Sequence, residues 1–233
     1  MKISQAGVLE IAEHEGIVLG PYLDSVGVWT YGVGHTAAAG KPDPAKMKRE
    51  DTRKLSPEAV ELELARALVL FDEDLDKYEE RVTKAVKVPL KQHEFDALVS
   101  FDFNTGGIFK AKLTEAINRG DKSGAGFMGW VKPKEIIGRR KAEQALFRTG
   151  NYAANGDKIP VYDALGDGRI RYRMTITGAK MRSLMPVRPT TAAKPSGHVM
   201  PEPHMTTNPN QPKHWLTTVI NVVAWLFTLG GRK

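Results

Sequence analysis

The chain has 233 residues, of which 34 are Lys or Arg and 27 are Asp or Glu, so its formal net charge is +7. Its apolar fraction of 41% is sufficient for a buried core, which excludes a wholly disordered chain, and the absence of cysteine excludes disulfides, a thiolate nucleophile and a Cys-type zinc site. The basic excess favours an anionic partner, such as nucleic acid, acidic lipid headgroups or the carboxylates of a cell-wall polymer, without choosing among them.

The first 15 residues lack the continuous apolar core of a signal peptide, because Gln5, Glu10, Glu13 and His14 interrupt it. We therefore expect a protein that is made in the cytoplasm without a signal peptide. If it acts outside the cytoplasm, another agent must release it.

A short helix is predicted between Ser4, a favourable N-cap, and Gly16, a typical C-terminal stop. One face of this helix carries Val8, Ile11, Ala12 and Glu15. Glu15 therefore points toward the core, at the negative end of the helix dipole. Burial and the dipole both disfavour its charged form, which is what a general acid working near neutral pH requires.

Residues 22–25 and 28–33 are predicted to form two strands around Gly27, which can take a positive φ in a short hairpin loop. If Gly27 is near the centre of the turn, Asp24 and Thr30 lie opposite each other and face the same side. A sugar bound between the helix and this hairpin would meet an acid on one face and a water held by Asp24 and Thr30 on the other. That is the arrangement used for glycoside hydrolysis.

The middle of the chain is predicted to be mostly helical. Ser56 and Pro57 have the pattern of an N-cap followed by proline in the first turn, and the apolar repeat that follows predicts a long amphipathic helix. The apolar positions of this repeat are Val60, Leu64, Ala67, Leu68, Phe71 and Leu75. A second helix follows Pro89 and stops at residues 104–107, and shorter helical patterns lie at 113–118 and 144–148.

Residues 159–177 have the pattern of strand, turn and strand, with Gly166-Asp167-Gly168 at the turn. Alternation in the second strand predicts that Arg169, Arg171 and Arg173 share one face. That face is either a solvated polar surface or a contact for an anionic polymer.

The last part of the chain changes composition. Half of the 14 prolines fall between residues 186 and 212, which predicts an extended linker at 187–213, with an ordered surface loop as the alternative. Residues 214–233 are predicted to form an amphipathic helix, because 11 of the 15 residues at 215–229 are apolar. That apolar span is about 22 Å long as a helix, short of the ~30 Å of a bilayer core. We expect it to lie in a membrane interface; the alternative is docking on the main domain or on a second copy.

The motifs of residues 15–36 resemble the signature of the phage-type lysozymes, glycoside hydrolase family 24, which include the endolysins of tailed phages. The matching residues are Glu15-Gly16, Tyr22-x-Asp24, Gly27 and Thr30-x-Gly32-x-Gly34-His35-Thr36. The spacing Glu, eight residues, Asp, five residues, Thr is that of the family's catalytic triad. The resemblance extends over about residues 1–150 through matches at Leu90, Phe95–Phe101, Phe103-Asn104, Ile117-Asn118, Gly120, Trp130 and 137–147.

The resemblance implies an α+β, mainly helical fold with two lobes, one a small β-hairpin lobe and one helical. It implies that Glu15 protonates the glycosidic oxygen between N-acetylmuramic acid and N-acetylglucosamine, that Asp24 stabilises the oxocarbenium charge, and that Thr30 holds the water. Arg139 matches an arginine that pairs with the catalytic glutamate; because such a pair favours the ionised acid, the net effect on Glu15 stays open. Phe103 and Asn104 match residues beside the substrate, with core packing as the alternative for Phe103.

The sequence thus predicts an endolysin with a catalytic domain at 1–150, a basic β-hairpin extension at 151–186, and the linker and helix described above. The expected partners are peptidoglycan and an anionic membrane surface, with no nucleic acid, cofactor or metal, and the expected state is a monomer acting in the periplasm after release. His35 is predicted to be a structural hydrogen-bonding residue. The alternatives are a lytic transglycosylase and a non-catalytic protein that binds wall or membrane.

Overall fold

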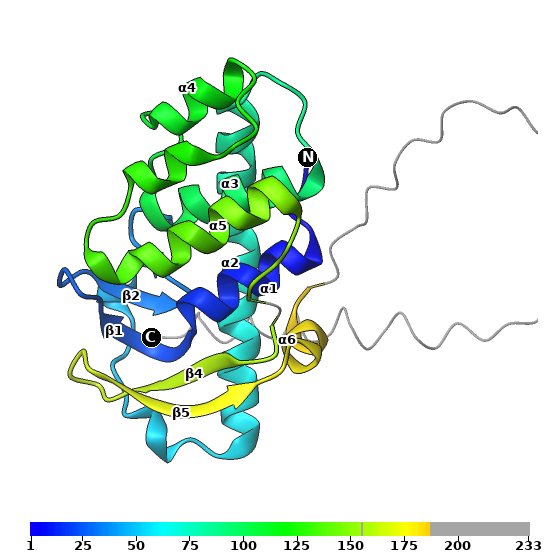
Figure 1. Ribbon diagram of the computed structural model, residues 1–233. Helices are drawn as coiled ribbons and strands as arrows, with labels where there is room; N and C mark the ends of the chain where they lie inside the picture. Colours follow the sequence, from blue (N-terminus) through cyan, green and yellow to red (C-terminus); the bar gives the residue numbers. More distant parts are fainter. Residues whose placement is uncertain (155, 187–233) are drawn as a thin grey trace, which may run out of the picture. The chain divides into compact units, whose positions relative to one another are not determined.

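Figure 1 shows the computed structural model of the chain, in which residues 1–154 and 156–186 are described. They belong to one folded unit, Met1–Thr191. The predicted linker at 187–213 and the predicted helix at 214–233 lie outside the described residues. Among the described residues, every helix is too short or too polar to cross a bilayer.

The described part of the chain is α+β and mainly helical, as predicted. Its helices are α1 (Gln5–Glu15), α2 (Pro57–Ala85), α3 (Gln92–Thr105), α4 (Lys112–Asn118), α5 (Ile137–Thr149) and α6 (Gly178–Leu184). Short 3₁₀ turns are η1 (Pro44–Lys46), η2 (Thr52–Lys54), η3 (Ala125–Gly129) and η4 (Lys134–Ile136).

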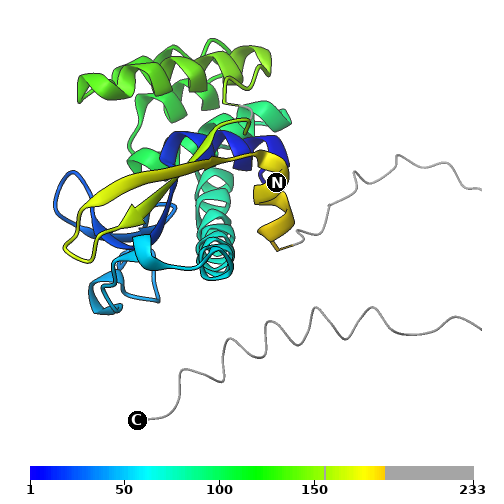
Figure 2. The same ribbon diagram turned by 90° about the horizontal axis from the view of Figure 1, so that it is seen from below.

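Helix α2 joins the two lobes, because it packs on the sheet along part of its length and on α3 along another part (Figures 1 and 2). The Ser56 hydroxyl accepts a hydrogen bond from the Ala59 N–H, which confirms the predicted N-cap. All six apolar side chains of the predicted stripe are buried: Val60, Leu64, Ala67, Leu68, Phe71 and Leu75.

Helix α3 ends as predicted, since Gly106 takes the left-handed conformation with φ 58°. Helix α5 is longer than the predicted segment at 144–148. Its first half was missed because the side chains that it buries are Arg139, Arg140 and Glu143, so no apolar repeat marks them.

The sheet has five strands in the order β3-β2-β1-β4-β5. Their bounds are β1 (Ile17–Leu23), β2 (Trp29–Gly32), β3 (His35–Thr36), β4 (Ile159–Ala164) and β5 (Ile170–Ile176). The predicted hairpin at 159–177 is present, but β4 also pairs in parallel with β1, through Ile17 opposite Val161 and Val18 opposite Tyr162. The hairpin is therefore built into the same sheet as the N-terminal strands, and the predicted boundary at residue 150 falls inside one unit.

The prediction that three arginines share one face of β5 is wrong. Tyr162 pairs with Tyr172 and Val161 with Met174, so Arg173 is an extra residue that interrupts the alternation. Arg173 turns inward to Asp163 at 2.8 Å, while Arg169 pairs with Asp167 inside the turn.

Candidate active site

Glu15 is the last residue of α1, and Gly16 separates it from the start of β1. The Ser4 hydroxyl accepts the Gly7 N–H at 3.1 Å, and Gly16 ends the helix with φ 73°. Val8, Ile11 and Ala12, the apolar members of the predicted face, are buried, whereas the Glu15 side chain is 23% exposed. The helix is thus fixed on the core and presents this carboxylate at its edge.

A buried arginine of α5 holds the Glu15 carboxylate. The Arg139 Nη1 group donates a hydrogen bond to Glu15, and Arg139 Nε donates to Glu143 at 3.1 Å. Burial by itself would lower the pKa of Arg139, but the negative charges of Glu15 and Glu143 raise it above its ordinary value. Arg139 therefore stays cationic beside Glu15.

Behind Arg139 lies a second layer of buried polar groups. The Glu143 carboxylate accepts hydrogen bonds from Ser100 Oγ at 2.9 Å and from Arg140 Nη2 at 2.8 Å. Burial raises the pKa of Glu143, and the two guanidinium groups oppose that shift. Sequence reasoning did not propose Ser100 or Glu143 as site residues, although both stand within the motifs that resemble the lysozymes.

The segment that follows α5 is hydrogen-bonded to α1. The Ala154 N–H donates to Glu10 at 2.9 Å, and the Gly156 N–H donates to Glu13 at 2.7 Å. Two carboxylates of α1 are thus held by backbone groups that lie about 140 residues later in the chain. These contacts fix the helix that presents Glu15.

Asp24 and Thr30 do not lie opposite each other, which corrects the predicted register. Strand β1 ends one residue before Asp24, and Thr30 is paired with Tyr22. The Asp24 Oδ1 atom accepts the N–H groups of Val26 at 2.9 Å and Val28 at 2.8 Å, so this carboxylate closes the turn. The turn is longer than predicted, because the aspartate belongs to it: residues 24–28 connect the two strands, and Gly27 has the expected positive φ of 80°.

Thr30 is buried and uses its hydroxyl hydrogen within the same turn. Its Oγ1 donates to the Val28 carbonyl at 3.1 Å, so the oxygen lone pairs remain as acceptors. In the described part of the chain, the Asp24 carboxylate has only the two turn N–H groups as hydrogen-bond donors. The second oxygen of Asp24 and the oxygen of Thr30 can therefore serve a water or a substrate.

Tyr22 lies near both carboxylates. Burial raises the pKa of its phenol, and the negative charges of Glu15 and Asp24 raise it further. The phenol thus remains a neutral hydrogen-bonding group between them. The sequence contained this signal in the motif Tyr22-x-Asp24, but Tyr22 was not among the predicted site residues.

Phe103 and Asn104 lie where α3 meets the sheet lobe. The Phe103 ring packs on Phe71 at 5.6 Å and Tyr78 at 4.9 Å between ring centroids, and it approaches the backbone of Gly34. Asn104 is exposed and accepts a hydrogen bond from Arg140 at 3.1 Å. Phe103 is half-buried, so it both packs the core and reaches the surface.

His35 is buried, and its ring nitrogens contact Asp74 at 2.6 Å and the Pro42 carbonyl at 2.9 Å. This confirms its predicted structural role. Within the described ranges, no three His, Asp or Glu side chains are grouped as metal ligands.

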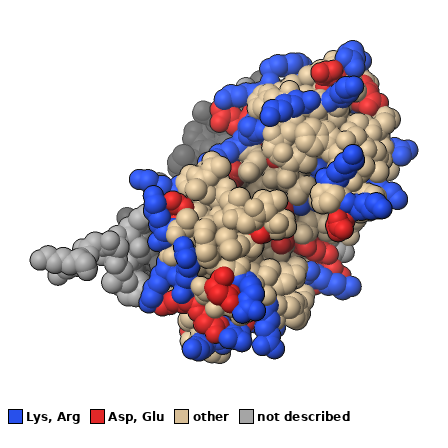
Figure 3. All heavy atoms as spheres, turned by 90° about the vertical axis from the view of Figure 1, so that its left-hand side faces the viewer, with Lys and Arg blue, Asp and Glu red and all other residues tan. Residues whose placement is uncertain are grey.

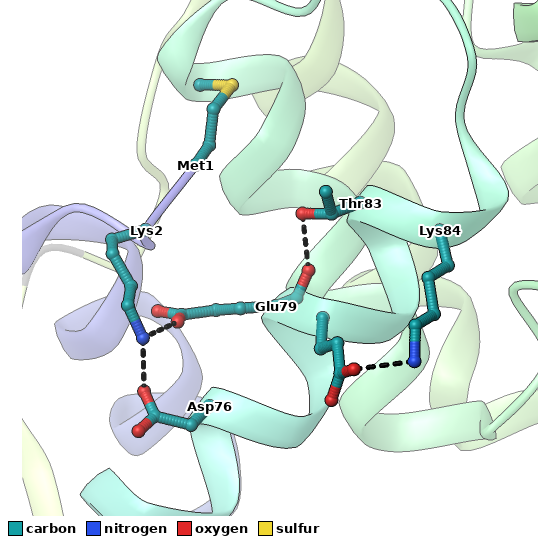
Figure 4. Close-up of a pocket in the computed structure, with 7 residues that line it drawn as sticks. Met1, Lys2, Asp76, Glu79, Thr83 and Lys84 are labelled. Atoms are coloured by element: carbon teal, nitrogen blue, oxygen red, sulfur yellow. Dashed lines mark hydrogen bonds and ion pairs between the residues drawn. The ribbon is translucent and has the colours of Figure 1, made fainter.

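A pocket lies where the N-terminal segment meets α2, and its charged groups pair with one another (Figure 4). Lys2 contacts Asp76 at 2.7 Å and Glu79 at 2.8 Å. None of the residues predicted to be catalytic lines this pocket.

Comparisons with known proteins show which proteins this chain resembles. A family model described as Phage lysozyme matches residues 12–144. The chain is 33% identical over 162 residues to an endolysin of Acyrthosiphon pisum secondary endosymbiont phage 1, covering 64% of this chain and 99% of the relative. It is 34% identical to the endolysin of Salmonella phage P22, covering 63% and 98%. A solved endolysin from Escherichia coli O157:H7 phage FAHEc1 has a TM-score of 0.50 and 30% identity, covering 65% of this chain and 96% of that one. The hairpin of β4 and β5 lies beyond the residues that the family model matches.

Proposed function

The chain belongs to the phage lysozyme family and is a peptidoglycan-degrading endolysin of the glycoside hydrolase type; from this we propose that it hydrolyses the β-1,4 bond between N-acetylmuramic acid and N-acetylglucosamine. The observation that carries the proposal is the arrangement at the two ends of β1. Glu15, paired with buried Arg139, lies two residues before the first residue of β1, and Asp24 directly follows the last.

Glu15 acts as the general acid in this proposal. It gives its proton to the glycosidic oxygen and becomes a carboxylate as the bond breaks. Arg139 stabilises that carboxylate, because its guanidinium is already in place and needs no reorganisation. The buried contacts of Arg139 with Glu143 and Ser100 hold its guanidinium in this position before the reaction begins.

Asp24 acts on the sugar ring, and Thr30 acts on the attacking water. The Asp24 carboxylate is oriented by two turn N–H groups and stabilises the positive charge that develops on the sugar ring. Thr30 accepts a hydrogen bond from the attacking water, because its own hydroxyl hydrogen is directed to Val28. The water oxygen bonds to the anomeric carbon, and the proton that the water loses passes to a carboxylate of the site. Water is thereby added to the sugar, and a 1,6-anhydro ring does not form.

Product analysis on purified peptidoglycan tests this assignment. Glu15→Gln should reduce turnover by about 10²–10⁴-fold while unfolding at the same temperature as the wild type. Hydrolysis leaves a reducing muramic acid, which mass spectrometry separates from the 1,6-anhydro ring that a lytic transglycosylase leaves. Substantial lysis by Glu15→Gln would refute the role of Glu15, and anhydro products would refute hydrolysis.

We also propose that residues 214–233 bring the enzyme to an anionic membrane surface after its release into the periplasm. A variant that ends at Thr191 keeps the whole folded unit. It should digest exposed peptidoglycan as fast as the full chain and lyse intact cells that have an outer membrane more slowly. Equal rates in both assays would refute the membrane role.

A further inference from the structure

The β4–β5 hairpin borders β1 from one end to the other. Near the Glu15 end, Val18 pairs with Tyr162, and at the Asp24 end the Leu23 N–H donates to the Gly168 carbonyl at 2.8 Å. Since the proposed catalytic carboxylates stand at the two ends of β1, the hairpin runs alongside the whole span between them. In Figures 1 and 2, β4 also lies beside α1, the helix that presents Glu15.

Two tyrosines of the hairpin share the sheet face opposite to the one that carries Ile17 and Val161. Ile17 and Val161, which pair, are both core residues, so the next pair, Val18 and Tyr162, points to the opposite face. Tyr172 is paired with Tyr162 and lies on the same face. Their rings meet edge to face, with centroids 6.1 Å apart.

The tyrosine face begins at the catalytic end of α1. A Cβ atom added to Gly16 would lie 2.8 Å from the Tyr162 ring, so this ring rests on the backbone next to Glu15. Tyr172 continues outward from there and is 56% exposed, and Ile170 beside it is 42% exposed. An exposed aromatic surface that starts at a reactive residue is typical of a ligand-binding surface.

The chemistry of this surface suits a neutral sugar more than a charged partner. A tyrosine ring offers an apolar face for the C–H groups of a sugar ring and a hydroxyl for its polar groups. Figure 3 shows the side of the molecule where the two hairpin turns lie; Lys and Arg gather at its margins, and uncharged side chains occupy most of the middle. The nearby Arg169 and Arg173 are already paired with carboxylates.

We propose that Tyr162 and Tyr172 form a sugar-binding platform that holds the glycan strand of peptidoglycan beyond the saccharides at the cleaved bond. The proposal rests on the proposed muramidase function. The platform belongs to a hairpin outside the family match, so it adds binding surface to the lysozyme site without changing the reacting groups.

Steady-state hydrolysis of purified peptidoglycan tests the platform through Tyr172→Ala, with Phe109→Ala as the matched control. Phe109 is 55% exposed, lies between α3 and α4, and is covered by the guanidinium of Arg81 from α2. Tyr172→Ala should raise KM about 2- to 12-fold with little change in kcat, as expected for a lost aromatic contact, and Tyr172→Phe should restore most of the affinity. A KM for Tyr172→Ala equal to that of Phe109→Ala would overturn the proposal.

Binding is measured separately in the Glu15→Gln background, by co-sedimentation with insoluble peptidoglycan. Adding Tyr172→Ala should weaken co-sedimentation by the same factor as it raises KM, and adding Phe109→Ala should leave it unchanged. A wild-type chain that does not hydrolyse peptidoglycan would refute the proposed function, whereas unchanged co-sedimentation of the Tyr172→Ala variant would refute the platform. If Tyr172→Ala lost binding to phosphatidylglycerol vesicles while its KM for peptidoglycan stayed unchanged, Tyr172 would be a membrane contact, and the sugar assignment would be overturned.

Discussion

The two sides of the active site are held in different ways. On the helical side, Glu15 is fixed by Arg139, which is 124 residues away in the sequence and is itself held by buried Glu143. On the sheet side, the Asp24 carboxylate is fixed by N–H groups two and four residues away. The acid thus depends on the packing of the whole fold, whereas the turn carries its own support. Substitutions in the buried support behind Arg139 should therefore cost stability and activity together, and those on the sheet side should separate the two.

The largest effect is expected from Glu143→Ala. It leaves the guanidinium groups of Arg139 and Arg140 buried with one carboxylate fewer, which should lower the free energy of unfolding by about 3–5 kcal/mol. Urea denaturation measures the loss. Glu135→Ala, at an exposed position just before the same helix, is the control and should change stability by less than about 0.5 kcal/mol. A loss below about 1 kcal/mol for Glu143→Ala would contradict the view that Arg139 depends on the buried Glu143 carboxylate.

The next effect concerns the geometry of the acid. Arg139→Lys keeps the positive charge but removes the planar donor set that joins Glu15, Glu143 and Ser100. We expect kcat/KM on peptidoglycan to fall about 10²-fold, because Glu15 loses its fixed position. Arg148→Lys, on an exposed face of the same helix, should leave the rate unchanged. A rate for Arg139→Lys within about twofold of the wild type would show that charge alone suffices.

A smaller effect distinguishes the two roles of Asp24. Asp24→Asn keeps an oxygen that accepts the turn N–H groups of Val26 and Val28, so stability should stay near that of the wild type while hydrolysis falls. Asp24→Ala removes the acceptor as well and should destabilise the protein by about 1 kcal/mol more. Thermal unfolding measures the difference, with exposed Ser25→Ala as the control. Equal stability of the two Asp24 variants would mean that the turn does not need the side chain.

The sequence predicted the elements that are determined by neighbouring residues. The cap at Ser4, the stop at Gly16 and the apolar stripe of α2 are local signals, and all three are present. The parallel pairing of β4 with β1 joins residues about 140 positions apart, and no local pattern encodes such a partner. The inward face of α5 was missed because its buried groups are charged and pair with one another, which a hydrophobic periodicity cannot reveal.

His35 is the exception on the sheet side, because it ties β3 to α2 over a long sequence distance. Burial by itself would lower the pKa of His35, but hydrogen bonds to Asp74 and to the Pro42 carbonyl raise it above its ordinary value, with nearby Lys77 opposing them. A raised pKa in the folded state means that the folded protein binds the proton more tightly than the unfolded chain. The contribution of His35 is therefore complete below about pH 6.5, the ordinary value of the unfolded chain, and declines as the pH rises through the raised value.

The expected change is the smallest of the series, because only the part of the stability linked to one proton varies. Urea unfolding of the wild type and of His35→Gln, from about pH 5 to pH 9, measures it as a difference, and groups that titrate in both proteins cancel. The difference should be largest at the acidic end and shrink toward the alkaline end, since the neutral ring cannot donate to both Asp74 and Pro42. A difference that stays constant with pH would mean that the ring acts through packing alone, and the sheet side would then lack a charge-dependent tie to α2.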